Sequence, residues 1–285
     1  MAYLHAMSLF IASLNSGSNG NCYYIGNQKE AILIDAGISC RETERRMKRL
    51  ELSMKMVKAI FVSHEHADHI YGVSRLSRKY QLPVYITATT RKEGRLILKE
   101  NLAIPFRAYE PVTIGNLSVT AFPKFHDATD PHSFIVTGDA VNVGVFTDIG
   151  QPCEHVIRHF EQCNAAFLES NYDEELLETG SYTVPLKNRI RDGRGHLSNK
   201  QALQLFMNHR HECMSHLFLS HLSKNNNSPK IVKQLFSAIA GRTEIIIAPR
   251  DTETKLYHIR NIPGFTSKPV KRTLESLHVQ LSLFQ

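Results

Sequence analysis

This 285-residue chain contains the stretch Ser63-His64-Glu65-His66-Ala67-Asp68-His69. The stretch puts four side chains that can bind a metal directly after an apolar run, 57–62, whose composition predicts a buried strand. His64 and His66 alternate along an extended segment, so they point the same way and can share one ion. Asp68 and His69 face a neighbouring position, where the chain turns into a helix. Because zinc, manganese and iron accept imidazole and carboxylate ligands, this stretch predicts a metal site.

Four more polar side chains occupy the same setting, each close after an apolar run: His126, Asp148, Glu169 and His221. A rigid sheet positions the loops at its strand ends and leaves them exposed, so binding groups gather there. Each residue taken alone is better explained as a structural histidine or a turn carboxylate. Together the four form an array of strand ends around the block at 64–69, and this array favours one site.

Strands and helices alternate along the whole chain without a linker, a repeat or a low-complexity block, which predicts one domain, 1–285, of class α+β. Predicted strands cover 9–14, 22–25, 31–34, 57–62, 84–87, 112–114, 117–122, 134–137, 141–146, 165–168, 216–219 and 244–248. One predicted helix begins at the capping residue Ser39. Further predicted helices cover 73–80, 153–162, 201–208 and 229–240. Polar turns between apolar runs predict antiparallel hairpins, which argue against a plain doubly wound sheet. The basic, mixed segment 262–285 predicts a C-terminal docking tail.

Composition excludes several classes of protein. The chain is 42% hydrophobic and 21% charged, as folded proteins are, and it holds no apolar run of about 18 residues that could cross a membrane. Its first residues lack a basic region and are interpreted as a strand rather than a signal peptide. The five cysteines are scattered, odd in number and free of CxxC spacing, which favours reduced thiols in a cytoplasmic protein.

The charge distribution is compatible with a polyanionic partner. Lysine and arginine outnumber aspartate and glutamate by 34 to 27, and the pI is near 9.1. Four cations gather in one short segment: Lys187, Arg189, Arg191 and Arg194. Phosphodiester backbones need such donors, whereas a neutral lactam or thioester does not. With Ser198 and Asn199, they are the predicted substrate-binding residues, although a merely solvated basic segment explains the cations too.

The order of these motifs resembles the metallo-β-lactamase superfamily, whose signature is HxHxDH followed by a later His, Asp and His. The resemblance covers about residues 8–260. Shorter strings at 16–21, 169–173, 195–199 and 219–227 resemble the YycJ/WalJ-like branch of that superfamily. Tyr172 departs from the branch pattern, in which a histidine is more common, so the role of this position stays open.

The resemblance implies a four-layer αββα sandwich with a site for two divalent metal ions (Zn, Mn or Fe) at one edge. His64, His66 and His126 are then expected to hold the first ion. Asp68, His69 and His221 are expected to hold the second, and Asp148 to bridge the two. Asp35 matches the aspartate that supports the ligand loop in this superfamily. A hydroxide held between the two ions is the implied nucleophile.

The resemblance also assigns catalytic roles to Asp68, His196 and Glu169, with His196 paired to Glu169 and protonating the leaving oxygen. A helix-entry histidine with a structural hydrogen bond is the plain alternative for His196. The implied activity is that of a 5′–3′ DNA exonuclease, with DNA a more probable substrate than RNA. The segment between Asp148 and His221 is too short for the inserted domain of β-CASP nucleases.

Two other classes of function stay open. A small-molecule hydrolase of the glyoxalase II or lactonase type shares the ligand set, and it predicts activity on thioesters or lactones that is indifferent to salt. Nucleic-acid binding, by contrast, weakens steeply as salt rises. A binding or regulatory protein with a vestigial metal site is disfavoured, because all seven expected ligands are present.

Overall fold

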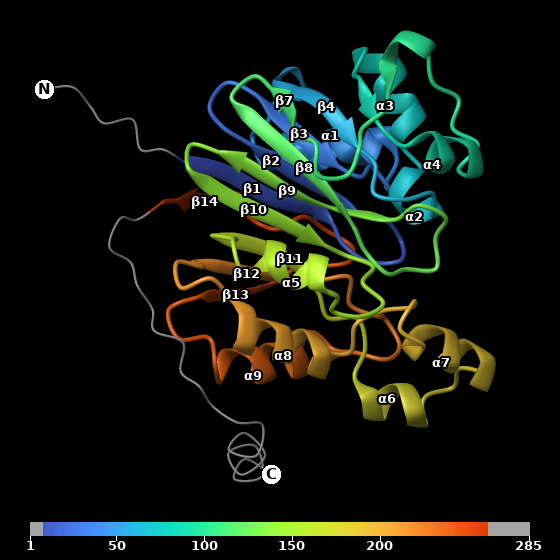
Figure 1. Ribbon diagram of the computed structural model, residues 1–285, viewed down its shortest axis with the longest axis vertical. Coiled ribbons are helices and arrows are strands. Elements are labelled where there is room, and N and C mark those ends of the chain that lie inside the picture. The colour runs from blue at the N-terminus through green and yellow to red at the C-terminus, as the bar shows by residue number, and fades with distance from the viewer. Residues whose placement is uncertain (1–7, 262–285) are drawn as a thin grey trace, which may run out of the picture.

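Two seven-stranded sheets face each other in the computed structural model, which describes residues 8–261 (Figure 1). The first sheet runs in the order β14 (Tyr257–Arg260), β1 (Ser8–Asn15), β2 (Cys22–Gly26), β3 (Ala31–Ile34), β4 (Val57–Phe61), β5 (Val84–Tyr85) and β6 (Ala103–Ile104). The second runs in the order β13 (Glu244–Ile247), β12 (His216–Ser220), β11 (Ala165–Glu169), β10 (Val141–Phe146), β9 (His132–Gly138), β8 (Leu117–Pro123) and β7 (Val112–Ile114). The predicted docking tail lies outside the described residues.

Each sheet is antiparallel at one side and parallel at the other. β14, β1, β2 and β3 pair antiparallel, and β3 to β6 pair parallel. In the second sheet β7 to β10 pair antiparallel and β10 to β13 parallel. β8 therefore runs in the same direction as β10 to β12, and the carboxyl ends of all four strands meet at one edge. Ligands bind beyond this edge in open α/β sheets.

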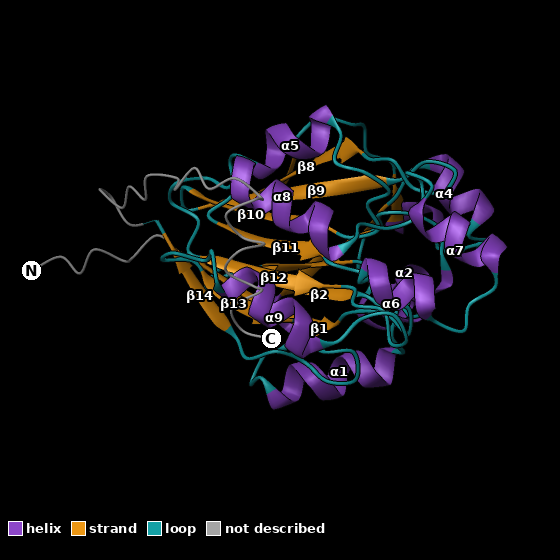
Figure 2. Ribbon diagram, turned by 90° about the horizontal axis from the view of Figure 1, so that it is seen from below, coloured by secondary structure: helices purple, strands orange, loops and turns teal. Residues whose placement is uncertain are grey.

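Helices cover both outer faces, so the predicted αββα sandwich is confirmed. α1 (Cys40–Arg49) and α3 (Val73–Tyr80) bury Met47, Val73 and Leu76 against the first sheet. α5 (Glu154–Phe160), α8 (Asn199–His209) and α9 (Pro229–Ser237) lie across the second sheet (Figure 2). α2 (Ala67–Ile70), α4 (Ala88–Glu93), α6 (Glu174–Thr179) and α7 (Val184–Arg191) lie at the edge where the strands end. Within 8–261, no helix is long and apolar enough to span a bilayer.

A hydrophobic core fills the space between the sheets. Strand residues alternate between this core and the outer layers: Ala165 and Phe167 of β11 point inward, whereas Ala166 and Leu168 pack under the helices. Both faces are therefore apolar, as expected for parallel strands that are covered on both sides. The continuous apolar runs in the sequence follow from this double coverage.

The predicted hairpins and most predicted elements are confirmed. Ser39 caps α1, and its side chain accepts a hydrogen bond from the Glu42 amide. The helix predicted at 201–208 begins earlier, at Asn199, because Ser198 and Gln201 form a capping box. The sequence analysis did not predict α4, α6, α7, β6 or β14. α7 buries no residue and so shows no apolar period, and β14 is defined by its pairing with the distant β1.

Phe134 of β9 tests the packing between the sheets. Its ring is fully buried, with its centroid 5.8 Å from that of Phe61 in the opposite sheet and 5.6 Å from that of Phe106. Phe134→Ala should lower the free energy of unfolding by about 3–5 kcal/mol, measured by urea denaturation, because it leaves a cavity. Val184→Ala, at a position 66% exposed, is the control and should change it by less than about 0.5 kcal/mol. Equal effects would show that Phe134 does not join the two sheets.

Candidate metal centre

The predicted ligands gather at the carboxyl ends of the strands although they are far apart in the chain. His64 and His66 lie between β4 and α2, and Asp68 and His69 lie in the first turns of α2. His126 follows β8, Asp148 follows β10, and His221 follows β12. The structure therefore brings together all seven residues that the sequence analysis selected as ligands.

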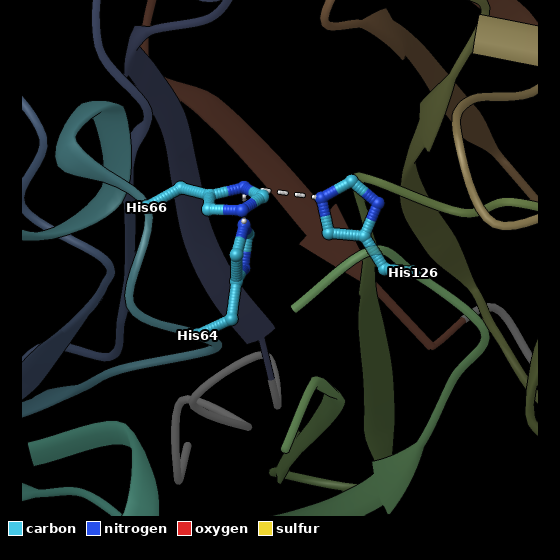
Figure 3. A group of neighbouring side chains, drawn as sticks. All are labelled: His64, His66 and His126. Atoms are coloured by element: carbon cyan, nitrogen blue, oxygen red, sulfur yellow. Dashed lines mark hydrogen bonds between the residues drawn. The ribbon is translucent and has the colours of Figure 1, made fainter. Parts of the chain in front are cut away.

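His64, His66 and His126 point toward one another from two separate loops (Figure 3). His66 Nδ1 lies 3.1 Å from His64 Nε2 and 3.3 Å from His126 Nε2. Two nitrogens bound to one tetrahedral zinc at about 2.0–2.1 Å lie about 3.3 Å apart. The three imidazoles are therefore spaced as ligands of a single ion.

A second group adjoins the first and shares Asp148 with it. Asp68 Oδ2 lies 3.6 Å from His69 Nε2 and 3.6 Å from His221 Nε2. Asp148 reaches both groups: Oδ2 lies 2.9 Å from His69 Nε2, and Oδ1 lies 3.8 Å from His126 Nε2. Asp148 therefore stands where one carboxylate can contact two ions.

Four of the five histidines have their other ring nitrogen fixed by the protein. His64 Nδ1 contacts Ser63 Oγ at 2.9 Å, and His126 Nδ1 contacts the Gly195 carbonyl at 3.0 Å. His69 Nδ1 lies 2.7 Å from Asp35 Oδ2, and His221 Nδ1 lies 2.9 Å from Glu169 Oε1. Such contacts orient the ring and direct Nε2 to the centre. Protein-bound metals are commonly supported in this way.

Asp35 links the first sheet to the ligand loop, in the position expected of it. Its Oδ1 accepts from the Ser63 amide at 2.8 Å, and its Oδ2 accepts from Ser63 Oγ at 2.7 Å as well as contacting His69. Asp35 is fully buried. A single carboxylate thus positions both ends of the loop from Ser63 to His69.

Three of these residues adopt the left-handed backbone region, which is uncommon outside glycine. The φ angles are 58° at Asp35, 53° at Asp148 and 55° at His221, each just after a strand. Such conformations cost of order 1–3 kcal/mol and occur where surrounding contacts enforce them, as at functional sites. The sharp turn at each strand end brings the side chain to the centre.

The electrostatics of the cluster fit divalent cations. Burial lowers the pKa of His64 well below its usual value and that of His126 to about 4, so both are neutral donors. Burial opposes protonation of His221 too, yet the carboxylates of Asp148, Asp68 and Glu169 raise its pKa to about 10. In the absence of a metal, a proton therefore compensates this carboxylate charge. His221 Nε2 is buried without a hydrogen bond, as expected for a nitrogen that can bind a cation.

Glu169 holds His196 beside the cluster. His196 Nδ1 lies 2.8 Å from Glu169 Oε1, and Glu169 Oε2 accepts from the amides of Ile149 and Leu197. Burial raises the pKa of Glu169, but the His196 and His221 imidazoles lower it to about 2, so it is ionised. His196 is partly exposed and lines a cavity of about 240 Å³ together with His66, Asp68 and Asp148. The pair is placed to act on a molecule in that cavity.

The predicted substrate-binding cations lie on or just after α7, and three of them already have partners. Arg189 Nε lies 2.6 Å from Asp127 Oδ2, Arg191 pairs with Glu178 at 2.7 Å, and Lys187 donates to the Glu178 carbonyl. Arg194 is exposed. Of the four, only Arg189 lines the cavity.

Ser198 and Asn199 have structural contacts. Ser198 caps α8 and its hydroxyl also donates to Glu174 Oε1, and Asn199 Oδ1 accepts from Ser170 Oγ at 2.7 Å. Both are buried and hydrogen bonded, so their contact with substrate stays a prediction. Tyr172, whose role was left open, is buried and forms a β-bridge with Ser198.

The sequence analysis missed three residues that position the centre. The sequence patterns assign no role to Ser63, Asn21 or Lys124. Asn21 Nδ2 donates to Asp68 Oδ2 at 3.1 Å, and the buried Lys124 Nζ donates to the Thr147 carbonyl, next to Asp148, at 2.6 Å. A buried polar residue close to a strand end was the available signal, but the sequence does not show which groups it contacts.

Asp148→Asn should lower the metal content of the purified protein by roughly half or more, because an amide replaces the shared carboxylate. Elemental analysis by mass spectrometry measures this content. Asp139→Asn is the matched control: it lies at the hairpin turn before β10, at the opposite end of the strand, and asparagine tolerates its φ of 52°. Native metal content in Asp148→Asn would contradict a shared ligand.

Asp35→Asn should weaken metal binding by about 10–100-fold, because the loop loses its charged support while asparagine keeps the left-handed turn. Competition with a chromophoric chelator measures the affinity. Asp173→Asn, at the N-cap of α6, should leave it unchanged, since asparagine caps helices equally well. An unaltered affinity in Asp35→Asn would show that the loop holds its shape without this charge.

Comparison with known proteins places the chain in a family. The model of the beta-lactamase superfamily domain matches residues 30–221. The exodeoxyribonuclease YycJ of Bacillus anthracis is 32% identical over 236 residues, which cover 82% of this chain and 89% of the relative. The exodeoxyribonuclease WalJ of Streptococcus pneumoniae is 30% identical over 238 residues, covering 80% and 88%.

A solved structure supports the fold. The metallo-β-lactamase fold protein YhfI from Bacillus subtilis aligns with a TM-score of 0.66 at 17% identity, over 87% of this chain and 99% of that one. The sandwich, the order of the motifs and the two relatives agree with the resemblance in the sequence. The chain belongs to the metallo-β-lactamase superfamily of hydrolases and, within it, to the YycJ/WalJ branch.

Proposed function

We propose that this hydrolase is a metal-dependent phosphodiesterase that degrades DNA from the 5′ end. The pair formed by His196 and Glu169 carries the proposal, because its Nδ1–Oε1 contact of 2.8 Å fixes an imidazole beside seven candidate ligands. A phosphodiester has a poor alkoxide leaving group and needs a proton donor, which a thioester with its thiolate leaving group does not require to the same degree. The two relatives named exodeoxyribonucleases support DNA as substrate.

The candidate ligand set fits two divalent ions. His64, His66 and His126 would hold one, Asp68, His69 and His221 the other, and Asp148 both. When bound, zinc, manganese or iron would activate water and neutralise the anionic oxygens of the phosphodiester. Asp68 is proposed to take part in catalysis as well as to bind an ion, because its carboxylate is one-fifth exposed and lines the cavity in which a substrate would bind.

The remaining steps use the protein's own groups. Glu169 accepts from Nδ1 of His196, so Nε2 is the nitrogen left to protonate the leaving oxygen. The same carboxylate holds His221 in the ligand set, which ties the proton donor to the centre at a fixed spacing. Tyr182, Leu186 and Ile190 line the same cavity from the α6–α7 segment and offer apolar surface for a base or sugar.

His196→Ala should leave the metal content unchanged and slow cleavage by about 10²–10⁴-fold, because only the proton donor is lost. His209→Ala is the matched control. Its Nδ1 lies 2.7 Å from Glu161 Oε1, a similar histidine–glutamate pair at the end of α8, and its loss should not affect cleavage. Loss of metal in His196→Ala would show that His196 is a ligand rather than an acid.

The activity itself is tested on protein stripped of metal and resupplied with manganese or zinc. Duplex DNA labelled at the 5′ or the 3′ end, an RNA strand and a thioester are assayed side by side. Stepwise release from the 5′ end that requires metal is the expected result. Turnover of the thioester with inert nucleic acid would reject the proposal in favour of a small-molecule hydrolase, and faster digestion of RNA would reject the preference for DNA.

A further inference from the structure

A basic cleft lies between α3 and α4, outside the candidate metal centre. It has a volume of about 470 Å³. Its lining includes four cations and two large side chains with apolar surface: Arg75, Arg78, Arg95, Lys99, Tyr71 and Ile97. A second hollow of about 490 Å³, lined by Arg91 and Lys92, adjoins it, since Arg95 lines both. We call the two together the α3–α4 cleft.

Acids balance only part of the charge of this cleft. None of the described residues that line either hollow is acidic. Arg75, Arg78 and Arg95 are exposed and make no ion pair within 8–261, whereas neighbouring cations do: Arg91 pairs with Glu100, and Lys79 with Glu44. Three guanidinium groups are thus available to an anionic partner.

The cations of α7 differ in this respect. Arg189 and Arg191 are ion paired with Asp127 and Glu178, and a substrate must break those pairs to use them. Breaking an exposed pair costs little, but the paired acid also repels a phosphate at the same place. The α3–α4 cleft therefore offers the stronger attraction for a polyanion.

The cleft is continuous with the loop that carries the candidate ligands. Tyr71 stands two residues after His69, and Gly94, just before Arg95, packs so closely that an added Cβ would lie 2.9 Å from Ile70 Cδ1 and 3.4 Å from Glu65 Cβ. Figure 1 shows α2 next to α4 at the edge of the sandwich where the strands of the centre end. The cavity at the centre and the cleft share no lining residue, so a substrate must be extended to contact both.

Two large apolar side chains stand exposed at the cleft. Tyr71 is 72% exposed and Ile97 is 88% exposed, and both line the cleft beside the cations. An exposed ring next to guanidinium groups is the arrangement with which proteins bind single-stranded nucleic acid: bases stack on the ring and phosphates meet the cations. An inorganic anion would use the cations but leave the ring without a role.

We propose that the α3–α4 cleft binds the phosphodiester backbone and a base of the nucleic acid, several nucleotides away from the bond that is cleaved. This inference rests on the proposed nuclease function and extends it by locating a second substrate contact. It accounts for the surplus of positive charge beyond the metal centre. It also implies that long substrates bind more tightly than short ones, because only long ones reach the cleft.

The test removes the three unpaired cations together, in Arg75→Gln/Arg78→Gln/Arg95→Gln. Binding of a 5′-labelled single strand of about 20 nucleotides to metal-depleted protein is followed by fluorescence anisotropy between about 50 and 200 mM salt. Each phosphate contact contributes roughly 0.7 to the slope of log K against log salt, so the slope should fall by about 2 and the affinity at about 0.1 M salt by about 100-fold. Tyr71→Ala should weaken binding about 10-fold with the slope unchanged.

The control variant Arg158→Gln/Lys230→Gln/Lys233→Gln removes the same charge from exposed positions on α5 and α9, over the outer face of the second sheet. The control should change the slope of log K against log salt by less than half of the change in the cleft variant. Equal losses in both variants, or a native slope in the cleft variant, would overturn the proposal. In the second case an acidic protein becomes the candidate partner.

Cleavage separates this inference from the nuclease proposal. On a dinucleotide, which is too short to reach the cleft, the cleft variant should match the native protein, whereas the KM for the long strand should rise. An equal loss on both substrates would overturn the proposal. If the native protein cleaves no nucleic acid but the cleft variant still loses binding, the nuclease proposal fails and the binding site stands.

Discussion

The buried carboxylate of Asp35 is the contact on which the candidate centre depends. It lies at the end of β3, accepts two hydrogen bonds from Ser63 and contacts His69, so it connects the first sheet to both ends of the ligand loop. A fully buried carboxylate is costly unless its oxygens are paired, and here three contacts pair them. These contacts hold the loop in the arrangement in which His66 meets His126, which follows β8 of the second sheet. His126, Asp148 and His221 complete the cluster from that side.

Charge balance favours the binding of cations at the centre. Asp35, Asp148 and Glu169 are buried within one cluster, and the buried Lys124 donates to the Thr147 carbonyl beside Asp148. The pKa of Lys124 is lowered by burial, although the surrounding carboxylates act to raise it. The surrounding carboxylates also raise the pKa of His221, against the effect of burial, so that a proton on its ring compensates their charge. Divalent ions at the same place would release that proton and leave the imidazoles as neutral ligands.

The exposed cations of the surface differ in whether an acid pairs with them. On α7, acids partner Arg189 and Arg191 and fix their side chains, whereas Arg75, Arg78 and Arg95 at the α3–α4 cleft make no ion pair with any described residue. Total charge and sequence clustering do not distinguish these cases, because pairing depends on residues far away in the chain: Asp127 meets Arg189 across 62 positions. Three of the four cations in the predicted basic segment are therefore paired, whereas Arg75, Arg78 and Arg95 lie elsewhere and make no ion pair with a described residue.

The sequence predicted the fold class directly, and its resemblance to a known superfamily implied the layers and the seven candidate ligands. The local signal of the ligands is an apolar strand followed closely by imidazole or carboxylate, as at His64, Asp148 and His221. Which atoms meet depends on the tertiary structure. The support of His64 by Ser63, the approach of Asn21 to Asp68 and the left-handed turn at Asp148 depend on strands that pair across long stretches of chain. Short-range patterns record burial and turn preference, whereas contacts between distant strand ends exist only after the sheets have packed together.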